Sequence, residues 1–316
     1  MTDLATRMAH ANFASLSEPQ PEATKTAIER MPRAELTALQ QQWQDDGVIV
    51  LRNFMPADMR AAYCAAREQH LPKDRTQKDN FWGGWHFPTP YTVCDELQAL
   101  ALYRPLTDIL REVIGEEMGL HLALTGWVST ERNFHQDTYL NPASIWSYYL
   151  AVWIALDDIH PDAGPFEFVR GSHKWDVLRQ EKLFQYLTPE EQASPAWPSF
   201  TQDWVARACE DEITRHGGII EQFIPQGGDV LVWHSNLVHR GSQPKDPERL
   251  RKSLICHYSS VHRRPDMSDL RLHENGSQYF YFPAPGEEML PPEEPEIEPP
   301  KAGFSVRALF QKLLGK

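Results

Sequence analysis

Residues 147–157 read SYYLAVWIALD, a mostly apolar segment of about the length of one β-strand. From residue 115 onward, comparable short segments follow one another with turn-forming residues between them. The spacing favours an all-β sandwich or barrel with helices before it, that is, a mainly β fold with flanking helices. The predicted strands cover 119–129, 147–157, 166–170, 219–224, 229–234 and 251–260.

Helical periodicity lies mainly before these strands. Pro32 to Asp46 carries apolar residues at a spacing of three or four and ends at a glycine, and 48–51 then forms a short buried strand. Leu97 to Ile114 is predicted to be one helix, and 176–215 a helical or irregular insertion between strands. The aromatic, glycine-rich stretch 71–91 fits either a binding loop or a loop packed for stability.

Composition excludes several classes of protein. Lys and Arg number 31 against 44 Asp and Glu, a net charge of −13, which argues against non-specific binding to nucleic acid. The four cysteines form no C-x-x-C pair, so neither a disulfide scaffold nor a zinc knuckle is expected. The N-terminus lacks the pattern of a signal peptide, and no apolar run has the length of a membrane span, so we expect a cytoplasmic protein.

The two ends differ from the middle. Residues 1–30 are polar and rich in small side chains, which predicts a flexible arm before a single domain at 31–282. Residues 283–300 contain seven prolines and six glutamates, a linker composition. Residues 301–316 predict a basic amphipathic helix. It could make peripheral contact with a membrane surface, or pack on its own domain or on a second subunit.

A candidate metal site begins with His135 and Asp137, since residues two apart in an extended segment point the same way. With an imidazole from a distant strand they would form a two-His-one-carboxylate site, which suits non-haem Fe(II). The motif alone is weak, because His160 and Asp162 repeat it in a segment that predicts a surface turn.

An arginine at the start of the last long strand is a second candidate. If Arg251 points into the barrel, its permanent charge requires an anionic partner there, and a carboxylate is the natural one. The alternative is an arginine at the rim of the barrel, paired with Glu248 or Asp246.

Several motifs together resemble the phytanoyl-CoA dioxygenase family of Fe(II)- and 2-oxoglutarate-dependent oxygenases. The resemblance spans roughly residues 40–262 and implies a double-stranded β-helix, the cupin-like jelly roll, flanked by helices. The matching stretches, in family order, are DGVIVLRNF (46–54), HQD (135–137), AVWIALDDIHPDAGPFEFVRGSHK (151–174), GGDVLVWHSNLVHRGS (227–242) and RKSLICHYSS (251–260).

The resemblance also assigns roles to residues. It implies that His135, Asp137 and His239 are the iron ligands and that Arg251 pairs with the distal carboxylate of 2-oxoglutarate. It implies further co-substrate contacts from Ser242 and Trp153. Arg240 interrupts the family's usual His-Gly-Ser, which leaves Ser242 open and Arg249 as an alternative to Arg251. Lower-ranked candidates near 2-oxoglutarate are Thr125 and Tyr149.

Other aromatic and histidine residues have two interpretations each. Trp82, Trp85 and His86 could line the entrance for substrate or pack the loop. For His234, His173 and His257 a structural role is favoured over a ligand role, although His257 could face the barrel interior.

The resemblance implies an enzyme that uses Fe(II), 2-oxoglutarate and O2. The predicted reaction hydroxylates an aliphatic C–H bond of a small-molecule or lipid-linked substrate and releases succinate and CO2. A carboxylate at position 137 resembles the hydroxylases, since related halogenases leave that position without one. Alternatives are desaturation, cyclisation or demethylation by the same chemistry, a cupin-like metal enzyme that does not use 2-oxoglutarate, and a non-catalytic binding module.

Overall fold

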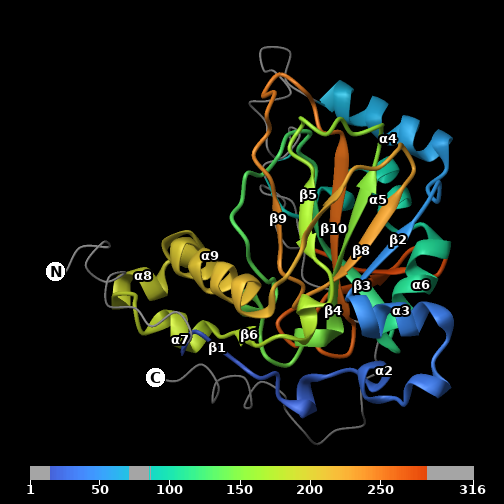
Figure 1. The fold of residues 1–316 in the computed structure, drawn as a ribbon. Coiled ribbons are helices and arrows are strands. Elements are labelled where there is room, and N and C mark those ends of the chain that lie inside the picture. Colours follow the sequence, from blue (N-terminus) through green and yellow to red (C-terminus); the bar gives the residue numbers. More distant parts are fainter. Residues whose placement is uncertain (1–14, 71–84, 86, 283–316) are drawn as a thin grey trace, which may run out of the picture. The chain divides into compact units, whose positions relative to one another are not determined.

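Two β-sheets face each other in the computed structural model, which describes residues 15–70, 85 and 87–282 (Figure 1). The larger sheet has seven strands in the order β11-β12-β3-β10-β4-β8-β2, and the smaller has three in the order β7-β5-β9. Neighbouring strands are antiparallel except β12 and β3, and each predicted strand segment overlaps one observed strand. The strands are β2 (Val48–Leu51), β3 (Met118–Leu124), β4 (Tyr149–Ala155), β5 (Phe166–Val169), β7 (Ile220–Phe223), β8 (Val230–His234), β9 (His239–Gly241), β10 (Ser253–Ser260), β11 (Leu270–Leu272) and β12 (Gln278–Phe280).

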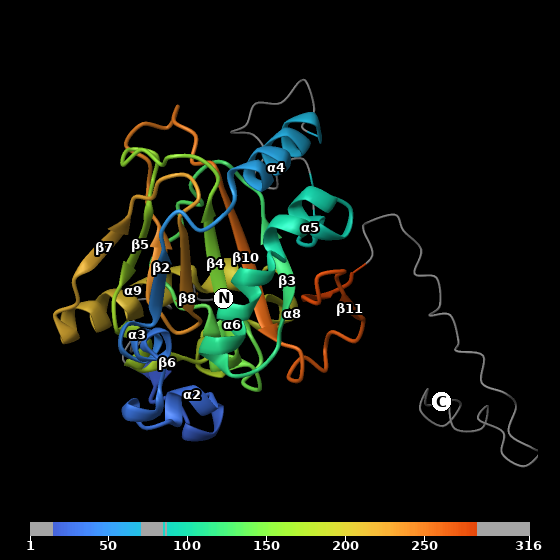
Figure 2. The same ribbon diagram turned by 90° about the vertical axis from the view of Figure 1, so that its right-hand side faces the viewer.

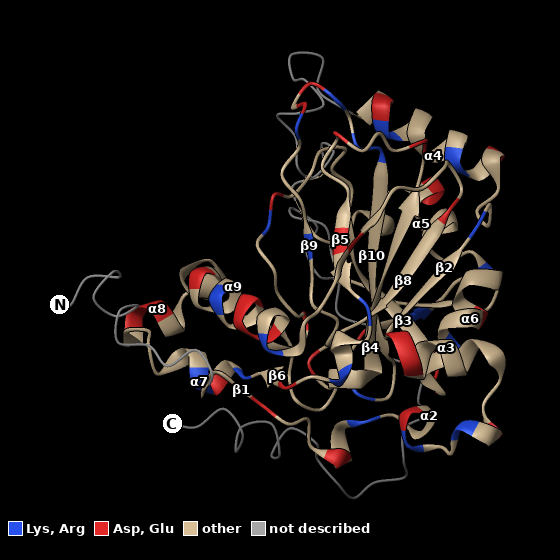
Figure 3. Ribbon diagram, in the orientation of Figure 1, with Lys and Arg blue, Asp and Glu red and all other residues tan. Residues whose placement is uncertain are grey.

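Strand β4 lies at the centre of the molecule and is buried on both faces. Val152 and Ile154 face the helices, whereas Ala151 and Trp153 face the smaller sheet and pack with residues such as Phe166. This double burial explains why the segment is almost continuously apolar rather than alternating. Strands β8 and β10 are also buried along their whole length, and Figure 3 shows that their ribbons carry no charged residue.

Helices cover the outer face of the large sheet (Figure 2). Their apolar side chains pack against the outward residues of β4, β8 and β10 to form the largest core cluster. The predicted helix over Leu97 to Ile114 is two helices, because the chain breaks at Leu102 and Pro105 then occupies the first turn of the second. The helices of this layer are α3 (Ala38–Asp46), α4 (Ala57–His70), α5 (Asp95–Ala101) and α6 (Arg104–Ile114).

The insertion predicted at 176–215 is helical apart from the short strand β6 (Val177–Leu178). Its helices are α7 (Gln180–Phe184), α8 (Pro189–Ala193) and α9 (Trp197–His216), which lie to the left in Figure 1. Their apolar residues form a separate core with Phe134, Tyr139 and Val238. Because these three residues flank the predicted metal ligands, the insertion supports that region of the barrel.

The described part of the predicted N-terminal arm, residues 15–30, contains a short strand and short helical turns. Strand β1 (Ser17–Glu18) pairs with β6, and the short helix α2 (Ala27–Arg30) begins with a Thr26–Glu29 capping box. Leu16 and Ile28 are buried. Residues 15–30 show little periodicity because each element there is only a few residues long.

The remaining boundary predictions concern the chain ends. Contacts group the described residues into one compact unit. The predicted linker at 283–300 and the predicted basic helix at 301–316 lie outside the described residues. Within the described ranges, no helix has both the length and the apolar character needed to cross a membrane.

Candidate metal centre and its cavity

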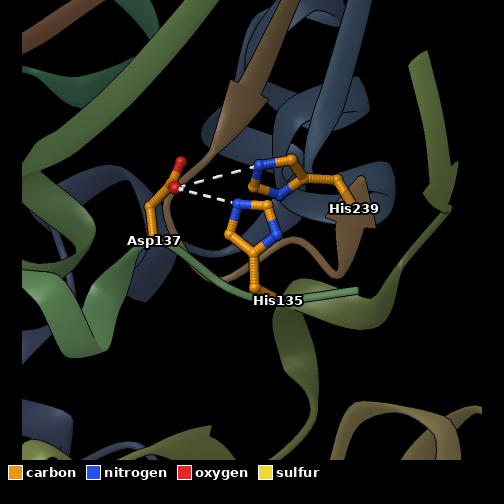
Figure 4. Close-up of side chains that lie close together, drawn as sticks. All are labelled: His135, Asp137 and His239. Atoms are coloured by element: carbon orange, nitrogen blue, oxygen red, sulfur yellow. Dashed lines mark ion pairs between the residues drawn. The ribbon is translucent and has the colours of Figure 1, made fainter. Parts of the chain in front are cut away.

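His135, Asp137 and His239 come together at the open edge between the two sheets (Figure 4). His135 and His239 face each other in an antiparallel bridge and exchange two backbone hydrogen bonds of 3.0 Å. Asp137 Oδ1 lies 3.7 Å from His135 Nε2 and 3.8 Å from His239 Nε2. All three side chains are buried, and one ligand atom from each lies within 4.8 Å of the others. The backbone bridge therefore sets residues 104 positions apart in the chain at ligand spacing.

The orientation of both imidazoles is fixed by the backbone. His135 Nδ1 lies 2.8 Å from the Asn133 carbonyl oxygen, and His239 Nδ1 lies 2.8 Å from the Leu237 carbonyl oxygen. With Nδ1–H donating to a carbonyl, the lone pair is on Nε2, the atom that faces Asp137. Burial holds the pKa of His135 well below its ordinary value and lowers the pKa of His239. Both rings are therefore neutral at pH 7 and able to coordinate a metal.

Asp137 is held in place by hydrogen bonds to two neighbouring residues, Ser235 and Trp233. Its backbone N–H donates to the Ser235 carbonyl oxygen at 2.8 Å, and the Trp233 indole N–H donates to its Oδ2 at 3.1 Å. Oδ1 is thus left facing the two imidazoles. The ring of Phe166 stacks on His239, with 5.2 Å between ring centroids. These contacts hold the ligand atoms before any ion binds.

The three residues line a cavity of about 650 Å³. Apolar side chains of the barrel interior, among them Leu122 and Ile255, form part of its wall. The first turn of α9 contributes Pro198 and Ser199, so the insertion also borders the cavity. A cavity of this volume is of the size that holds a small molecule beside a metal ion.

Arg251 lies in the same cavity wall and is 1 % exposed. Its guanidinium donates only to backbone carbonyls, to Gly164 at 2.9 Å and to Val128 at 3.3 Å, and its buried Nε has no partner among the described residues. Burial lowers its pKa to about 10, so it remains charged at pH 7. A buried cation with no carboxylate beside it among the described residues favours an anionic ligand.

The choice between the two arginines follows from their positions. Arg249 is exposed and pairs with Asp246 at 3.1 Å, the rim ion pair that was the alternative for Arg251. Ser242 is buried, but its hydroxyl donates to the Pro165 carbonyl oxygen at 2.7 Å and it is not among the cavity-lining residues. The strand presents Gly241 to the cavity instead.

Of the remaining candidates for contact with 2-oxoglutarate, Tyr149 lines the cavity, whereas Thr125 and Trp153 do not. Tyr149 lines the cavity, and its hydroxyl is hydrogen-bonded to His257 Nδ1. Thr125 and Trp153 are fully buried and do not line it, in contrast to the expectation, because Trp153 packs edge-on against Phe223 between the sheets.

Of the aromatic loop, Trp82 and His86 lie outside the described residues. Trp85 is buried, stacks on His70 with 4.5 Å between ring centroids and belongs to the helix-covered core. For Trp85 the structure favours packing over a role at the entrance.

The other histidines mostly have structural contacts. His234 is fully buried and lies 3.5 Å from Glu29, and His173 is buried beside it, with 5.3 Å between ring centroids. His257 differs from the favoured structural role because it lines the cavity and its Nε2 has no partner within the described part of the chain. His160 and Asp162 lie in an exposed turn, as predicted.

Sequence reasoning missed several residues of the cavity wall. Trp233 belongs to the stretch GGDVLVWHSNLVHRGS (227–242), but nothing in that stretch predicts a hydrogen bond to Asp137. Arg132 and Arg264 carry charge into the cavity wall, and His121 on β3 adds a buried imidazole. The position of Arg132 three residues before His135 was the one available signal.

A sequence model of one protein family, described as phytanoyl-CoA dioxygenase, matches residues 43–246, more than half of the chain. The chain belongs to this family. The predicted resemblance is thereby confirmed, and with it the enzyme class, a 2-oxoglutarate-dependent dioxygenase. No curated protein matches the chain.

Solved structures agree in fold. EctD from S. alaskensis with bound Fe aligns with a TM-score of 0.51 at 17% identity, over 79% of this chain and 82% of that one. The 2-oxoglutarate-dependent carbocyclase SnoK of nogalamycin biosynthesis aligns with a TM-score of 0.48 at 17% identity, over 73% and 87%. The likeness to EctD supports the predicted jelly-roll class.

Proposed function

We propose that the chain hydroxylates an aliphatic C–H bond of a small-molecule substrate, with Fe(II) held by His135, Asp137 and His239 and 2-oxoglutarate anchored by Arg251. The single observation that carries the proposal is their position in one cavity: three buried ligand atoms at metal spacing and a buried cation without an anion.

The donor set fits Fe(II). Two imidazole nitrogens and one carboxylate oxygen form the facial triad of non-haem iron oxygenases, which leaves open coordination positions. Ligand atoms about 2.1 Å from one ion lie roughly 3–4 Å from one another, as the N–O distances of 3.7 and 3.8 Å here do. When bound, iron with 2-oxoglutarate and O2 supplies the oxidising chemistry, with succinate and CO2 as co-products.

The cavity also fits a dicarboxylate. The Arg251 guanidinium is planar, charged and buried, which suits recognition of a carboxylate. The Gly164 and Val128 carbonyls that accept from it fix its position, so the anion meets a pre-oriented partner. Gly241 lies beside it, since a side-chain carbon there would lie in van der Waals contact with Arg251 Nη1, at 3.4 Å.

Protein side chains then orient the reactants and keep out water. Trp233 holds Oδ2 of Asp137, which leaves Oδ1 for the ion, and the carbonyls of Asn133 and Leu237 hold the imidazoles. Apolar residues around the cavity limit the access of water.

The test is spectroscopic and needs no knowledge of the substrate. Anaerobic addition of Fe(II) and 2-oxoglutarate should give the weak visible charge-transfer band of the chelate, and air should then give slow succinate release. Asp137→Ala should abolish both. The matched control is Asp162→Ala, which alters the second His-x-Asp motif in an exposed turn. Wild-type protein that gives neither the band nor succinate would refute the proposal.

A further inference from the structure

The cavity wall contains more positive charge than iron and 2-oxoglutarate require. Three arginines line it, Arg132, Arg251 and Arg264, against the acids Glu131 and Asp137. This is unexpected in a chain of net charge −13, in which acidic residues outnumber basic ones by 44 to 31. The additional arginines are therefore candidates for a role in recognition.

Arg132 is the arginine whose charge is least used. Its guanidinium donates to the Tyr139 hydroxyl at 3.3 Å and makes no ion pair with any residue that the structure describes. The side chain is half-buried at the cavity wall, three residues before His135. A guanidinium has five N–H donors, so most of its capacity is left for a ligand.

Arg132 lies in the wall of the cavity that contains the metal centre. Its side chain lines that cavity together with His135, Asp137, His239 and His257. An anionic group bound by Arg132 would therefore lie in the same cavity as the metal site.

Arg264 is less available. Its side chain is 6 % exposed, and its Nε and Nη2 bind the Asp266 carboxylate at 3.1 and 2.8 Å. The remaining Nη1 reaches Ser259 Oγ at 3.3 Å and Asn141 Oδ1 at 3.4 Å. Asp266 offsets its charge, and the guanidinium mainly braces the cavity wall.

If iron and 2-oxoglutarate bind as proposed, the positive charges of the cavity wall can be compared with the negative charges near them. Arg132 is then the arginine without a negative partner among the described residues. Asp137 and the iron offset each other in part, and Arg251 is matched by the distal carboxylate of 2-oxoglutarate. Glu131 is exposed and makes no ion pair with Arg132 within the described residues. A half-buried arginine beside a reaction site gains most from a ligand that brings a negative charge.

From this we infer that the primary substrate carries an anionic group, a carboxylate or a phosphate, which Arg132 binds while the apolar part of the substrate lies along Leu122, Leu140 and Phe166. This inference rests on the proposed function, and it assigns the substrate class of that same site. Arg132 is then the residue that selects acids over neutral analogues of the same shape.

The test uses hexanoate, hexyl phosphate and hexanamide as probes, because they share a chain that fits the apolar wall and differ in charge. Protein loaded with Ni(II) and saturating 2-oxoglutarate is titrated by calorimetry, so that Arg251 and the metal are occupied and no turnover occurs. We expect wild type to bind one of the two anions at least about tenfold more tightly than the amide, since a charge-assisted pair is worth about 1.5–3 kcal/mol. Arg132→Gln should remove the preference, and Arg132→Lys should keep part of it.

Arg249→Gln is the matched control, because it removes one arginine from an exposed ion pair outside the cavity. It should keep the wild-type preference. Equal binding of anions and amide by wild type would overturn the inference, as would a preference that survives in Arg132→Gln. An Arg132→Gln variant whose affinity for 2-oxoglutarate falls by as much would also overturn it, because Arg132 would then belong to the co-substrate. The Fe(II) charge-transfer band tests the proposed function separately.

Discussion

Trp233 shows how one residue outside the ligand set holds two of the ligands. Its indole N–H donates to Asp137 Oδ2 at 3.1 Å, and its ring lies 5.3 Å from the His239 ring, centroid to centroid. Such partners of a metal ligand fix its orientation, and their loss typically costs about 10–100-fold in metal affinity. The ligand arrangement therefore depends on a tryptophan from β8, a strand that supplies no ligand itself.

Trp233→Phe should lower the affinity for Fe(II) by about 10–100-fold while the fold is kept, since phenylalanine fills much of the same space without the N–H donor. Anaerobic calorimetric titration with Fe(II) measures this. Trp153→Phe is the matched control, because Trp153 lies in the same core and its indole N–H makes no hydrogen bond to any residue that the structure describes. Equal Fe(II) affinities of the two variants would contradict the role given to Trp233.

Arg251→Gln should raise the 2-oxoglutarate concentration that half-saturates the charge-transfer band by about 30-fold or more. The reason is that a buried, hydrogen-bonded charge pair is worth about 2–5 kcal/mol. Arg249→Gln should leave that concentration unchanged, since its partner is the exposed Asp246. The reverse result would assign the co-substrate to Arg249.

The iron ligands could be predicted from the sequence because they recur in motifs with fixed spacing, whereas their partners could not. Trp233 reaches Asp137 only because β8 and the loop after His135 are brought together by the fold, a contact across 96 positions of the chain. Likewise, the exposed ion pair of Arg249 and the buried position of Arg251 differ in the direction of the side chain, which two arginines in one turn-rich segment do not reveal.

Among the elements, strand β9 carries both a ligand and the glycine next to Arg251. Its three residues pair with β5, so that His239 lies opposite Phe168 and Gly241 opposite Phe166. Gly241 is required by close approach, since a side-chain carbon there would lie 2.5 Å from Thr130 Oγ1. The strand thus fixes one ligand and the space beside Arg251 together.

Gly241→Ala should therefore displace the Thr130 loop and narrow the cavity at Arg251. We expect a folded protein with roughly tenfold weaker 2-oxoglutarate binding, of the size expected for about 1.4 kcal/mol of lost contact. The charge-transfer titration measures it, and circular dichroism confirms the fold. Unchanged 2-oxoglutarate affinity would show that the loop moves without cost and that Gly241 has no role in the site.

Element boundaries were predictable where the residues that end a helix are local. Gly47 ends α3 in a left-handed conformation, as its position suggested. The break between α5 and α6 was missed, because apolar periodicity continues through Leu102 while Pro105 merely begins the next helix. The short elements at 15–30 depend on partners far along the chain, such as Leu178 in β6 and Ser147, and so left no periodic pattern.

At the scale of the whole molecule, the N-terminal segment is joined to the barrel through a buried carboxylate. Glu29 accepts hydrogen bonds from Thr26 N–H at 2.7 Å and from Ser147 Oγ at 3.0 Å, and lies 3.5 Å from His234 Nε2 on β8. Ser147 lies in the 3-10 turn that leads into β4, and His234 ends β8, so the approaches to two central strands meet the segment at this carboxylate. Burial alone would raise the pKa of Glu29, but His234 and the hydrogen bonds outweigh it and lower the pKa from 4.5 to about 2.

This difference makes stability depend on pH in a defined direction. A carboxylate whose pKa is lower in the folded state stabilises the fold above pH 4.5, and the contribution is lost as the pH falls toward 2. Its side chain is only 11 % exposed, and the contribution is roughly 3 kcal/mol of the free energy of unfolding.

The variant Glu29→Gln tests this, because it has no carboxylate at position 29 that could take up a proton. Urea denaturation of both proteins between about pH 6 and pH 3 should therefore show wild type more stable at pH 6 and the difference shrinking as the pH falls. Glu210→Gln, which alters an exposed carboxylate on α9, should follow wild type throughout. A difference between wild type and Glu29→Gln that does not change with pH would mean that the N-terminal segment is held by its apolar contacts, Leu16 and Ile28, and not by this carboxylate.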